Sequence, residues 1–345
     1  MKKTFTLAAI AMGFASPAMA ANMENPLYLP TAGTVYSKTN VGLMYKKIDS
    51  TDAQVAKNHD GAEEFPIWRV EEYIGYGITD RLSIDGQFGY TYNDDTGRKG
   101  LHLGRVGMNY RVLADADEIV WDVYAAAHLG GVSKMTGTYN FSPAAFGPST
   151  FDYDNYSTGQ YGVWVGTKVG KTWDNLTGAI FAEAAYYFPG NNTEINIANG
   201  IPGPAAAYLS ISDGTTATAK LKSFNDWNIG TKWSYEFDTK WTGGLGFAWK
   251  HHGAHEVESA KINGTIAGSG LLVAVTNSAL EAGFKGYDFL DSFDEFPVSV
   301  SIANQISESI QVAVYGEYTF DRGDKGSQNS TDAKVEGGVR LNVQF

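Results

Sequence analysis

Charged side chains recur at every second position of several apolar stretches, and their spacing makes them the best candidates for chemistry. Near the end of the chain, Glu336 and Arg340 alternate with Val335 and Val339. Because successive strand residues point to opposite faces of a sheet, such a segment has one ionic face and one apolar face. Ionic faces that oppose one another across water select small polar solutes and bias the flow of ions.

A second candidate is the group of histidines and acids formed by His251, His252, His255, Glu256 and Glu258. Histidine and carboxylate side chains are common zinc ligands. Adjacent strand residues point to opposite faces, so His251 and His252 can share an ion only if the chain leaves the strand there. We therefore expect no metal site and no cofactor.

The elements that position these residues are strands. From Thr34 onward the chain alternates apolar and polar residues with a period of two, in runs of about ten. Short and long connections follow each other in turn. The predicted short turns are 79–81, 113–117, 172–175, 238–240 and 307–309, and the predicted long loops are 49–65, 93–100, 131–160, 190–226, 253–295 and 321–331.

This pattern predicts an all-β fold, a transmembrane antiparallel β-barrel of about twelve strands over residues 34–345, with short periplasmic turns and long extracellular loops. A one-residue slip of the last strand would turn Lys334 and Arg340 toward lipid, at a cost of about 4–8 kcal/mol. Fourteen strands are the alternative, with 260–266 and 271–276 as an extra hairpin. Each half of that hairpin is shorter than the nine to eleven residues that a membrane strand needs.

The first residues predict the compartment. Lys2 and Lys3 precede an apolar stretch over 5–15, and Ala18-Met19-Ala20 follows, which is the pattern of a signal peptide over 1–20. We expect residues 21–33 to form a periplasmic N-terminal segment. Beyond residue 20, no run of eighteen apolar residues suggests a membrane helix. The expected location is the outer membrane.

Composition limits the partners. The formal net charge is -12, which argues against nucleic acid as a partner because phosphate binding needs clustered basic residues. The expected partners are outer-membrane lipids, lipopolysaccharide and small polar solutes. The acidic loops 49–65 and 253–295 are expected to be solvated surface, although such acids can share divalent cations with lipopolysaccharide phosphates.

Three features together resemble Gram-negative outer-membrane β-barrels of the porin and channel type. They are the signal peptide, the stretch YGITDRLSI from Tyr76 to Ile84, and the alternating end of the chain. The resemblance implies that the barrel-assembly machinery reads the terminal strand as an insertion signal, carried here by Val339, Leu341, Val343 and Phe345. YGITDRLSI is also similar to channel families linked to the uptake of hydrophobic or aromatic compounds.

Strand parity then predicts which side chains line the interior. Twelve strands lie between filled eight-stranded barrels and open sixteen-stranded ones, so we expect a narrow passage. Inward glycines such as Gly42, Gly75 and Gly166 are expected to leave space in it. The predicted lining residues are Lys38, Arg69, Glu71, Asp85, Arg111, Asp122, Lys168, Glu183, Lys232, Glu236, Glu317, Glu336 and Arg340.

The resulting expectation is a porin-like channel for passive diffusion of small polar solutes or ions, with a slight anion preference. One alternative is a plugged structural barrel, or a receptor or adhesin that uses its loops and does not conduct. An outer-membrane lipid hydrolase is a further alternative, which needs a His and a Ser together on the outward wall. His128 has inward parity and the chain lacks a G-x-S-x-G elbow, so we expect no enzyme.

Overall fold

The structure is a computed structural model of the chain, and it describes residues 22–48, 63–94, 97–114, 119–130, 134–141, 150–153, 159–199, 214–264, 277–278, 281–282, 284–285, 292–323 and 331–345. The predicted signal peptide lies outside these residues. The strands of the barrel are β1 (Val35–Ile48), β2 (Glu63–Thr79), β3 (Leu82–Asn93), β4 (Lys99–Ala114), β5 (Val120–Leu129), β8 (Tyr161–Trp173), β9 (Leu176–Tyr187), β12 (Phe224–Glu236), β13 (Trp241–His252), β15 (Phe293–Ser307), β16 (Ile310–Gly323) and β17 (Thr331–Gln344).

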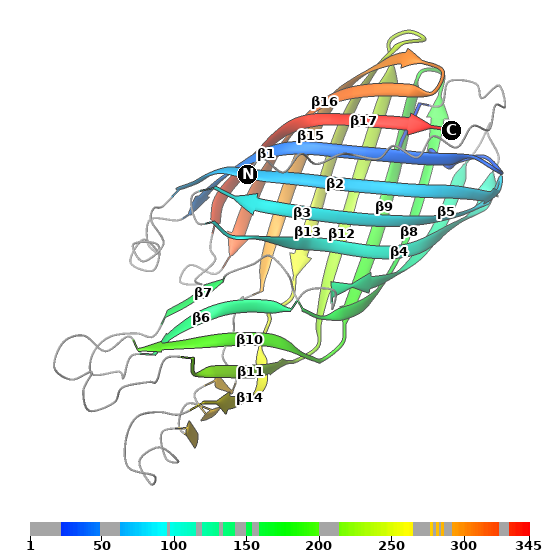
Figure 1. Cartoon of the computed structure of the whole chain (residues 1–345). Helices are drawn as coiled ribbons and strands as arrows, with labels where there is room; N and C mark the ends of the chain where they lie inside the picture. The colour runs from blue at the N-terminus through cyan, green and yellow to red at the C-terminus, as the bar shows by residue number, and fades with distance from the viewer. Residues whose placement is uncertain are drawn as a thin grey trace.

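These strands form a closed antiparallel barrel in the order β1-β17-β16-β15-β13-β12-β9-β8-β5-β4-β3-β2 (Figure 1). The ring closes where β1 pairs with β17, with Tyr36 opposite Gln344 and Val41 opposite Val339. The predicted fold class and strand number are therefore confirmed. The fourteen-strand alternative is wrong, because β14 (Val257–Asn263) pairs with a strand outside the barrel, and 271–276 lies outside the described residues.

Short and long connections alternate around the ring as predicted. The hairpins β2–β3, β4–β5, β8–β9, β12–β13 and β15–β16 turn at one end of the barrel, which we call the turn end. The start of β1 and the end of the chain after β17 also lie there, since Val35 and Phe345 exchange two backbone hydrogen bonds, of 3.2 and 2.8 Å. The long connections leave from the opposite end, which we call the loop end.

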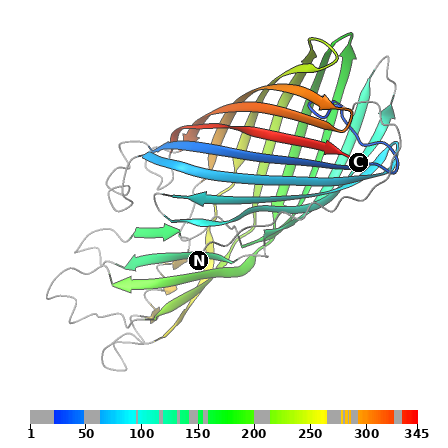
Figure 2. The same cartoon turned by 45° about the horizontal axis from the view of Figure 1, so that its top comes forward.

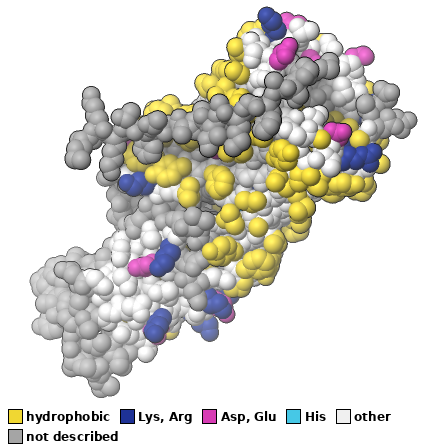
Figure 3. Space-filling model, turned by 45° about the vertical axis from the view of Figure 1, so that its right-hand side comes forward, with side chains coloured by type: hydrophobic (Ala, Val, Ile, Leu, Met, Phe, Trp, Pro, Cys, Tyr) yellow, Lys and Arg dark blue, Asp and Glu magenta, His cyan; other side chains and the backbone are white. Residues whose placement is uncertain are grey.

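The outer wall of the barrel is apolar. Figure 3 shows hydrophobic side chains along the barrel wall. Exposed residues such as Ile180, Val165 and Val339 lie in the middle parts of their strands, and exposed aromatic residues such as Trp173 and Trp249 lie near strand ends. Closure satisfies every strand's ladder hydrogen bonds, and an apolar belt between aromatic girdles matches the hydrocarbon layer. The chain therefore has the fold of an outer-membrane β-barrel. Within the described residues, no helix is long and apolar enough to span a bilayer.

Three of the long connections build a second sheet that the sequence did not predict. Its strands are β6 (Met135–Phe141), β7 (Thr150–Tyr153), β10 (Gly190–Asn199), β11 (Thr216–Leu221) and β14, in the order β14-β11-β10-β6-β7. Strands β10 and β6 pair in parallel although they come from different loops. Figures 1 and 2 show this outer sheet beyond the loop end of the barrel.

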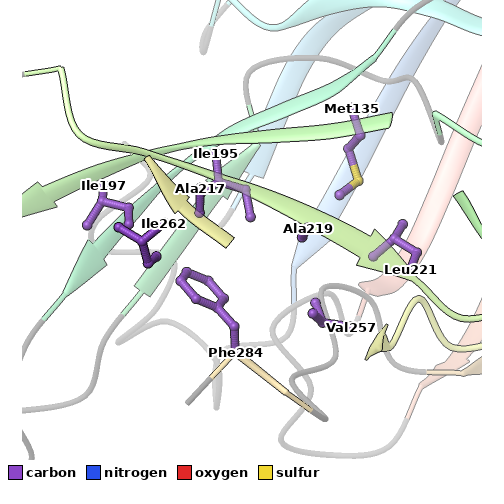
Figure 4. Packing of buried hydrophobic residues seen from close by; sticks show 9 residues of the cluster. All are labelled: Met135, Ile195, Ile197, Ala217, Ala219, Leu221, Val257, Ile262 and Phe284. Carbon is purple, nitrogen blue, oxygen red and sulfur yellow. The ribbon is translucent and has the colours of Figure 1, made fainter. Parts of the chain in front are cut away.

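The outer sheet has a hydrophobic core of its own (Figure 4). Ile195, Leu221 and Val257 are fully buried on one face of the sheet, and Phe284 from the connection after β14 covers them. Tyr139 packs against Phe284 with ring centroids 4.6 Å apart. The described parts of 190–226 and 253–295 that lie outside the barrel strands therefore contribute to a packed unit rather than to a solvated loop surface.

Candidate functional site: the charged interior of the barrel

The predicted lining residues alternate with the apolar residues of the outer wall, so their side chains point inward. Asp85 follows exposed Ile84, and Glu336 follows exposed Val335. Their part in any passage of solutes stays a prediction. The same inward parity holds for Lys38, Arg69, Glu71, Arg111, Asp122, Lys168, Glu183, Lys232, Glu236, Glu317 and Arg340.

Residues 22–34 fold into the turn end of the barrel. Asn22 donates to Glu236 at 2.8 Å and accepts from Gln311 at 3.2 Å. Further along the segment, a guanidinium nitrogen of Arg111 donates to the Leu27 carbonyl oxygen at 2.5 Å. These partners belong to inward-facing strand positions, so the segment occupies the interior at the turn end.

Glu24 is the main anchor of this N-terminal segment. Arg340 donates from Nη1 to both carboxylate oxygens, at 3.0 and 2.8 Å, and Asn342 donates to Oε1 at 3.1 Å. Ser301 donates to Oε2 at 3.3 Å, and Lys38 Nζ lies 3.8 Å from Oε1. A buried carboxylate persists only when charges and hydrogen bonds compensate for its lost hydration, and Glu24 has both.

Sequence reasoning placed 21–33 in the periplasm and missed these contacts, because the segment has no strand or helix periodicity. One signal was available. With Lys46, Arg105, Lys250 and Lys334 added to the predicted lining residues, inward parity gives ten basic side chains against seven acidic ones. Glu24 is the single acidic residue between 21 and 34. A surplus of inward positive charge at the turn end needs such a partner.

A second ionic group lies across β2, β1 and β17. Arg69 pairs with Glu71 and Glu336, with both nitrogen–oxygen distances at 2.6 Å. Tyr315 donates to the other oxygen of Glu336 at 3.0 Å. Both side chains reach over Gly42, where a Cβ atom would lie only 2.5 Å from the Tyr315 hydroxyl. Glycine at this position therefore lets β17 and β2 interact over the top of β1.

The expectation that inward glycines leave open space is wrong at several positions. The ring of Tyr36 covers Gly75 on the neighbouring strand, and the ring of Tyr124 covers Gly166 in the same way. An added Cβ would overlap the ring in each case. The small residue thus seats an aromatic side chain against the wall instead of widening the lumen.

Asp122 forms the centre of a third ionic group. Arg111 donates to its two carboxylate oxygens at 2.8 and 3.1 Å, and Lys168 Nζ lies 3.3 Å from Oδ2. Two cations around one fully buried carboxylate leave a net positive charge at this level of the interior.

Glu183 lies on the same wall and is held by neutral donors. Tyr124 donates to it at 2.5 Å and Asn228 at 2.6 Å. Close by, Lys232 Nζ lies 5.4 Å from the ring centroid of Phe181, a cation–π contact.

At the loop end, Lys334 forms an ion pair with Glu295, and His252 lies 3.5 Å from the same carboxylate. Glu295 was missed because 253–295 was interpreted as one loop, whereas β15 begins at Phe293 and places Glu295 opposite Lys250. The signal was its inward parity within β15.

The neighbouring histidines separate as strand geometry predicts. His251 Nδ1 lies 2.8 Å from Asp294 Oδ1, while His252 Nδ1 lies 3.7 Å from Asp226 Oδ2. His255, beyond the end of β13, packs against Phe224 with ring centroids 4.2 Å apart and a tilt of 40° between the rings. Burial lowers the pKa of His255 to about 4, although Asp226 acts in the opposite direction. Within the described residues, no group of three such side chains is arranged to hold a metal ion.

In the ion pairs of the interior, the basic side chain is the more exposed partner. Lys38 is 26% exposed against 6% for Glu24, and Arg111 is 15% exposed against 0% for Asp122. Lys334 is 23% exposed against 9% for Glu295. Within these ion pairs, the cation is therefore the partner that water in the interior reaches more readily.

No protein-family model and no curated protein matches this chain. Among solved structures, the NanC porin is similar to this chain at 9% identity and a TM-score of 0.39, and the match covers 87% of this chain and 98% of that one. OmpT, an outer membrane protein of Vibrio cholerae, is 9% identical with a TM-score of 0.33, and the match covers 92% of this chain and 99% of that one. The beta domain of the Bordetella autotransporter BrkA is 10% identical with a TM-score of 0.41, and the match covers 90% of this chain and 98% of that one.

Proposed function

We propose that this chain is an outer-membrane channel for the passive diffusion of small polar solutes, with a preference for anions. The observation that carries the proposal is the unequal exposure within the interior ion pairs, where cations face the water and carboxylates lie behind them. A solute in the lumen meets ammonium and guanidinium groups first, and these lower the energy of an anion relative to a cation.

The exposed fractions also support a wet interior. Arg69 and Lys38 face inward from a ring whose outer wall is apolar, yet each is about a quarter exposed. In a dry, close-packed interior such side chains would be inaccessible to water, and their burial would be strongly unfavourable in free energy. Twelve strands give a bore between those of filled and open barrels, which fits a narrow passage.

The N-terminal segment supports a second candidate, a barrel that is closed at the turn end and does not conduct. Asn22, Glu24 and Leu27 make polar contacts with inward-facing side chains, so the segment narrows the lumen there. The two candidates differ in one measurable property, the conductance of the folded protein in a bilayer.

Single-channel recording of the purified full chain in planar lipid bilayers, under a KCl gradient, tests the proposal. We expect discrete conductance steps and a reversal potential of the sign that chloride preference produces. Lys232→Gln removes one interior positive charge and should move the reversal potential toward zero. A folded protein that never conducts would overturn the channel and support the closed barrel.

Lys134→Gln is the matched control, because it also removes one positive charge. Lys134 immediately precedes β6 of the outer sheet and pairs with Glu194 of β10 at 3.1 Å. The reversal potential of this variant should equal that of the unmodified chain. Equal shifts in both variants, or cation preference in the unmodified chain, would contradict the proposed basic lining.

A further inference from the structure

Arg105 is an inward arginine of β4 that forms no ion pair with any residue the structure describes. Its side chain is partly exposed in the interior. The other inward arginines of the described barrel strands, Arg69, Arg111 and Arg340, each pair with a carboxylate. Asp85 of β3 attracts Arg105 electrostatically, but the two form no ion pair. The N–H donors of the Arg105 guanidinium are therefore left for a ligand.

Trp164 of β8 holds this guanidinium in place. The Cζ atom of Arg105 lies 4.8 Å from the centroid of the Trp164 ring, which is a cation–π contact. The ring is itself packed against the buried cluster of Ala185, Tyr187 and Phe224. A guanidinium positioned over an aromatic ring keeps the rigid fork of donors that matches the two oxygens of a carboxylate.

Polar atoms without partners lie beside Arg105. Gln87 of β3 is opposite Arg105 on one side, and His128 of β5 is opposite it on the other. Their side chains are buried, with exposed fractions of 3% and 5%. Gln87 Oε1, His128 Nδ1 and Trp164 Nε1 have no hydrogen-bond partner among the described residues. Because buried polar atoms are costly without a partner, their grouping around one unpaired cation points to a ligand there.

Tyrosines from four strands surround the same guanidinium. The charge of Arg105 acts on the hydroxyl groups of Tyr36, Tyr73, Tyr124 and Tyr187. These residues belong to β1, β2, β5 and β9, so the Arg105 side chain reaches into the lumen between them. All but Tyr187 are partly exposed. A molecule bound to Arg105 therefore has aromatic surface within its reach.

We propose that Arg105, Trp164 and these tyrosines form a binding site for small organic monocarboxylates. The carboxylate oxygens accept from the guanidinium fork, and the organic part lies against the tyrosine rings. Arg105 and Trp164 Nε1 offer only donors, and a carboxylate offers only acceptors. The unpaired cation of this site matches one negative charge. The inference rests on the proposed channel, whose solute class it narrows, although binding itself requires no conduction.

Isothermal titration of the purified, folded full chain with benzoate tests the site. We expect saturable binding of benzoate. Acetate should bind more weakly because it has no ring to contact the tyrosines, and benzamide should not bind because it has the ring without the charge. Arg105→Gln should weaken benzoate binding by about tenfold, the effect of losing a bidentate, charge-assisted pair. Arg105→Lys should also weaken it, since lysine keeps the charge and lacks the fork.

Arg81→Gln is the matched control. It makes the same substitution at an exposed position of the β2–β3 turn, outside the lumen, and should leave the benzoate affinity unchanged. Retarded migration of the unheated protein on a gel establishes that each variant is folded. Absence of benzoate binding to the unmodified chain, full affinity in Arg105→Lys, or equal losses in Arg105→Gln and Arg81→Gln would overturn the site.

The failure of the site and the failure of the channel give different results. A folded chain that binds benzoate but never conducts in a planar bilayer keeps the site and overturns the channel. A chain that conducts chloride but does not bind benzoate overturns the site alone.

Discussion

Glu24 and Arg340 are 316 residues apart in the sequence, yet one guanidinium nitrogen of Arg340 donates to both carboxylate oxygens of Glu24. The contact joins the N-terminal segment to the last strand of the barrel. It also fixes that segment at the turn end, at the point where a solute would leave or enter the lumen.

Breaking this ion pair should release the N-terminal segment. We expect Arg340→Ala and Glu24→Gln both to raise single-channel conductance, because a buried charge that loses its partner costs about 3–5 kcal/mol. The two variants change the interior charge in opposite directions and share only the lost pair. A rise in one variant with a fall in the other would assign the effect to charge and contradict release of the segment.

Substitution of Gly75 should destabilise the barrel through the ring of Tyr36. We expect Gly75→Ala to lower the free energy of unfolding by about 1–3 kcal/mol, because the new methyl group overlaps that ring. Urea titration of the folded protein in lipid measures the change. The Tyr36→Ala change should rescue Gly75→Ala, while Gly316→Ala, whose nearest atoms are 3.9 Å away, serves as the control with little effect.

Truncation of Phe284 should loosen the outer sheet and leave the barrel folded. Phe284 is buried among the residues that form the core of that sheet, and Phe-to-Ala changes in cores cost about 3–5 kcal/mol. Limited proteolysis of intact cells or proteoliposomes should cut Phe284→Ala faster outside the barrel. Phe320→Ala, at a lipid-facing position, should keep the original pattern; equal protection of both variants would show that Phe284 is dispensable.

Acidification should weaken the packing of His255 against Phe224. Burial lowers the pKa of His255 to about 4 from an ordinary 6.5, so the folded form binds fewer protons than the unfolded form. The contribution of neutral, buried His255 to the free energy of unfolding is complete above pH 6.5 and declines as the pH falls toward 4. Proteolysis near β14 should therefore accelerate over this range. The His255→Gln variant should show a flatter pH profile, and an unchanged profile would assign the effect to other groups.

Much of the barrel was predictable, because the alternation of apolar and polar residues within each strand depends on that strand's own sequence. Each strand reports its own two faces, so parity alone placed Asp122, Glu183 and Arg340 inward. The turn positions follow from where alternation stops.

The remainder depends on contacts between distant segments. Residues of β6 and β10 pair in parallel from different loops, and no sequence pattern specifies that partner. The N-terminal segment likewise has no periodicity, and Glu24 is held by Arg340, 316 residues away, as well as by nearby Lys38. The space above Gly75 was misjudged because a glycine does not reveal which neighbouring ring it seats.

The outer sheet has a consequence for the order of assembly. Its strands come from the connections β5–β8, β9–β12 and β13–β15, so it can form only after all three have crossed to the same side of the bilayer. Once complete, the outer sheet links six neighbouring barrel strands, β5, β8, β9, β12, β13 and β15, through their connections at the loop end. The opposite arc, with β1, β2, β16 and β17, contributes no connection to that sheet, so its strands are held only by their neighbours in the barrel.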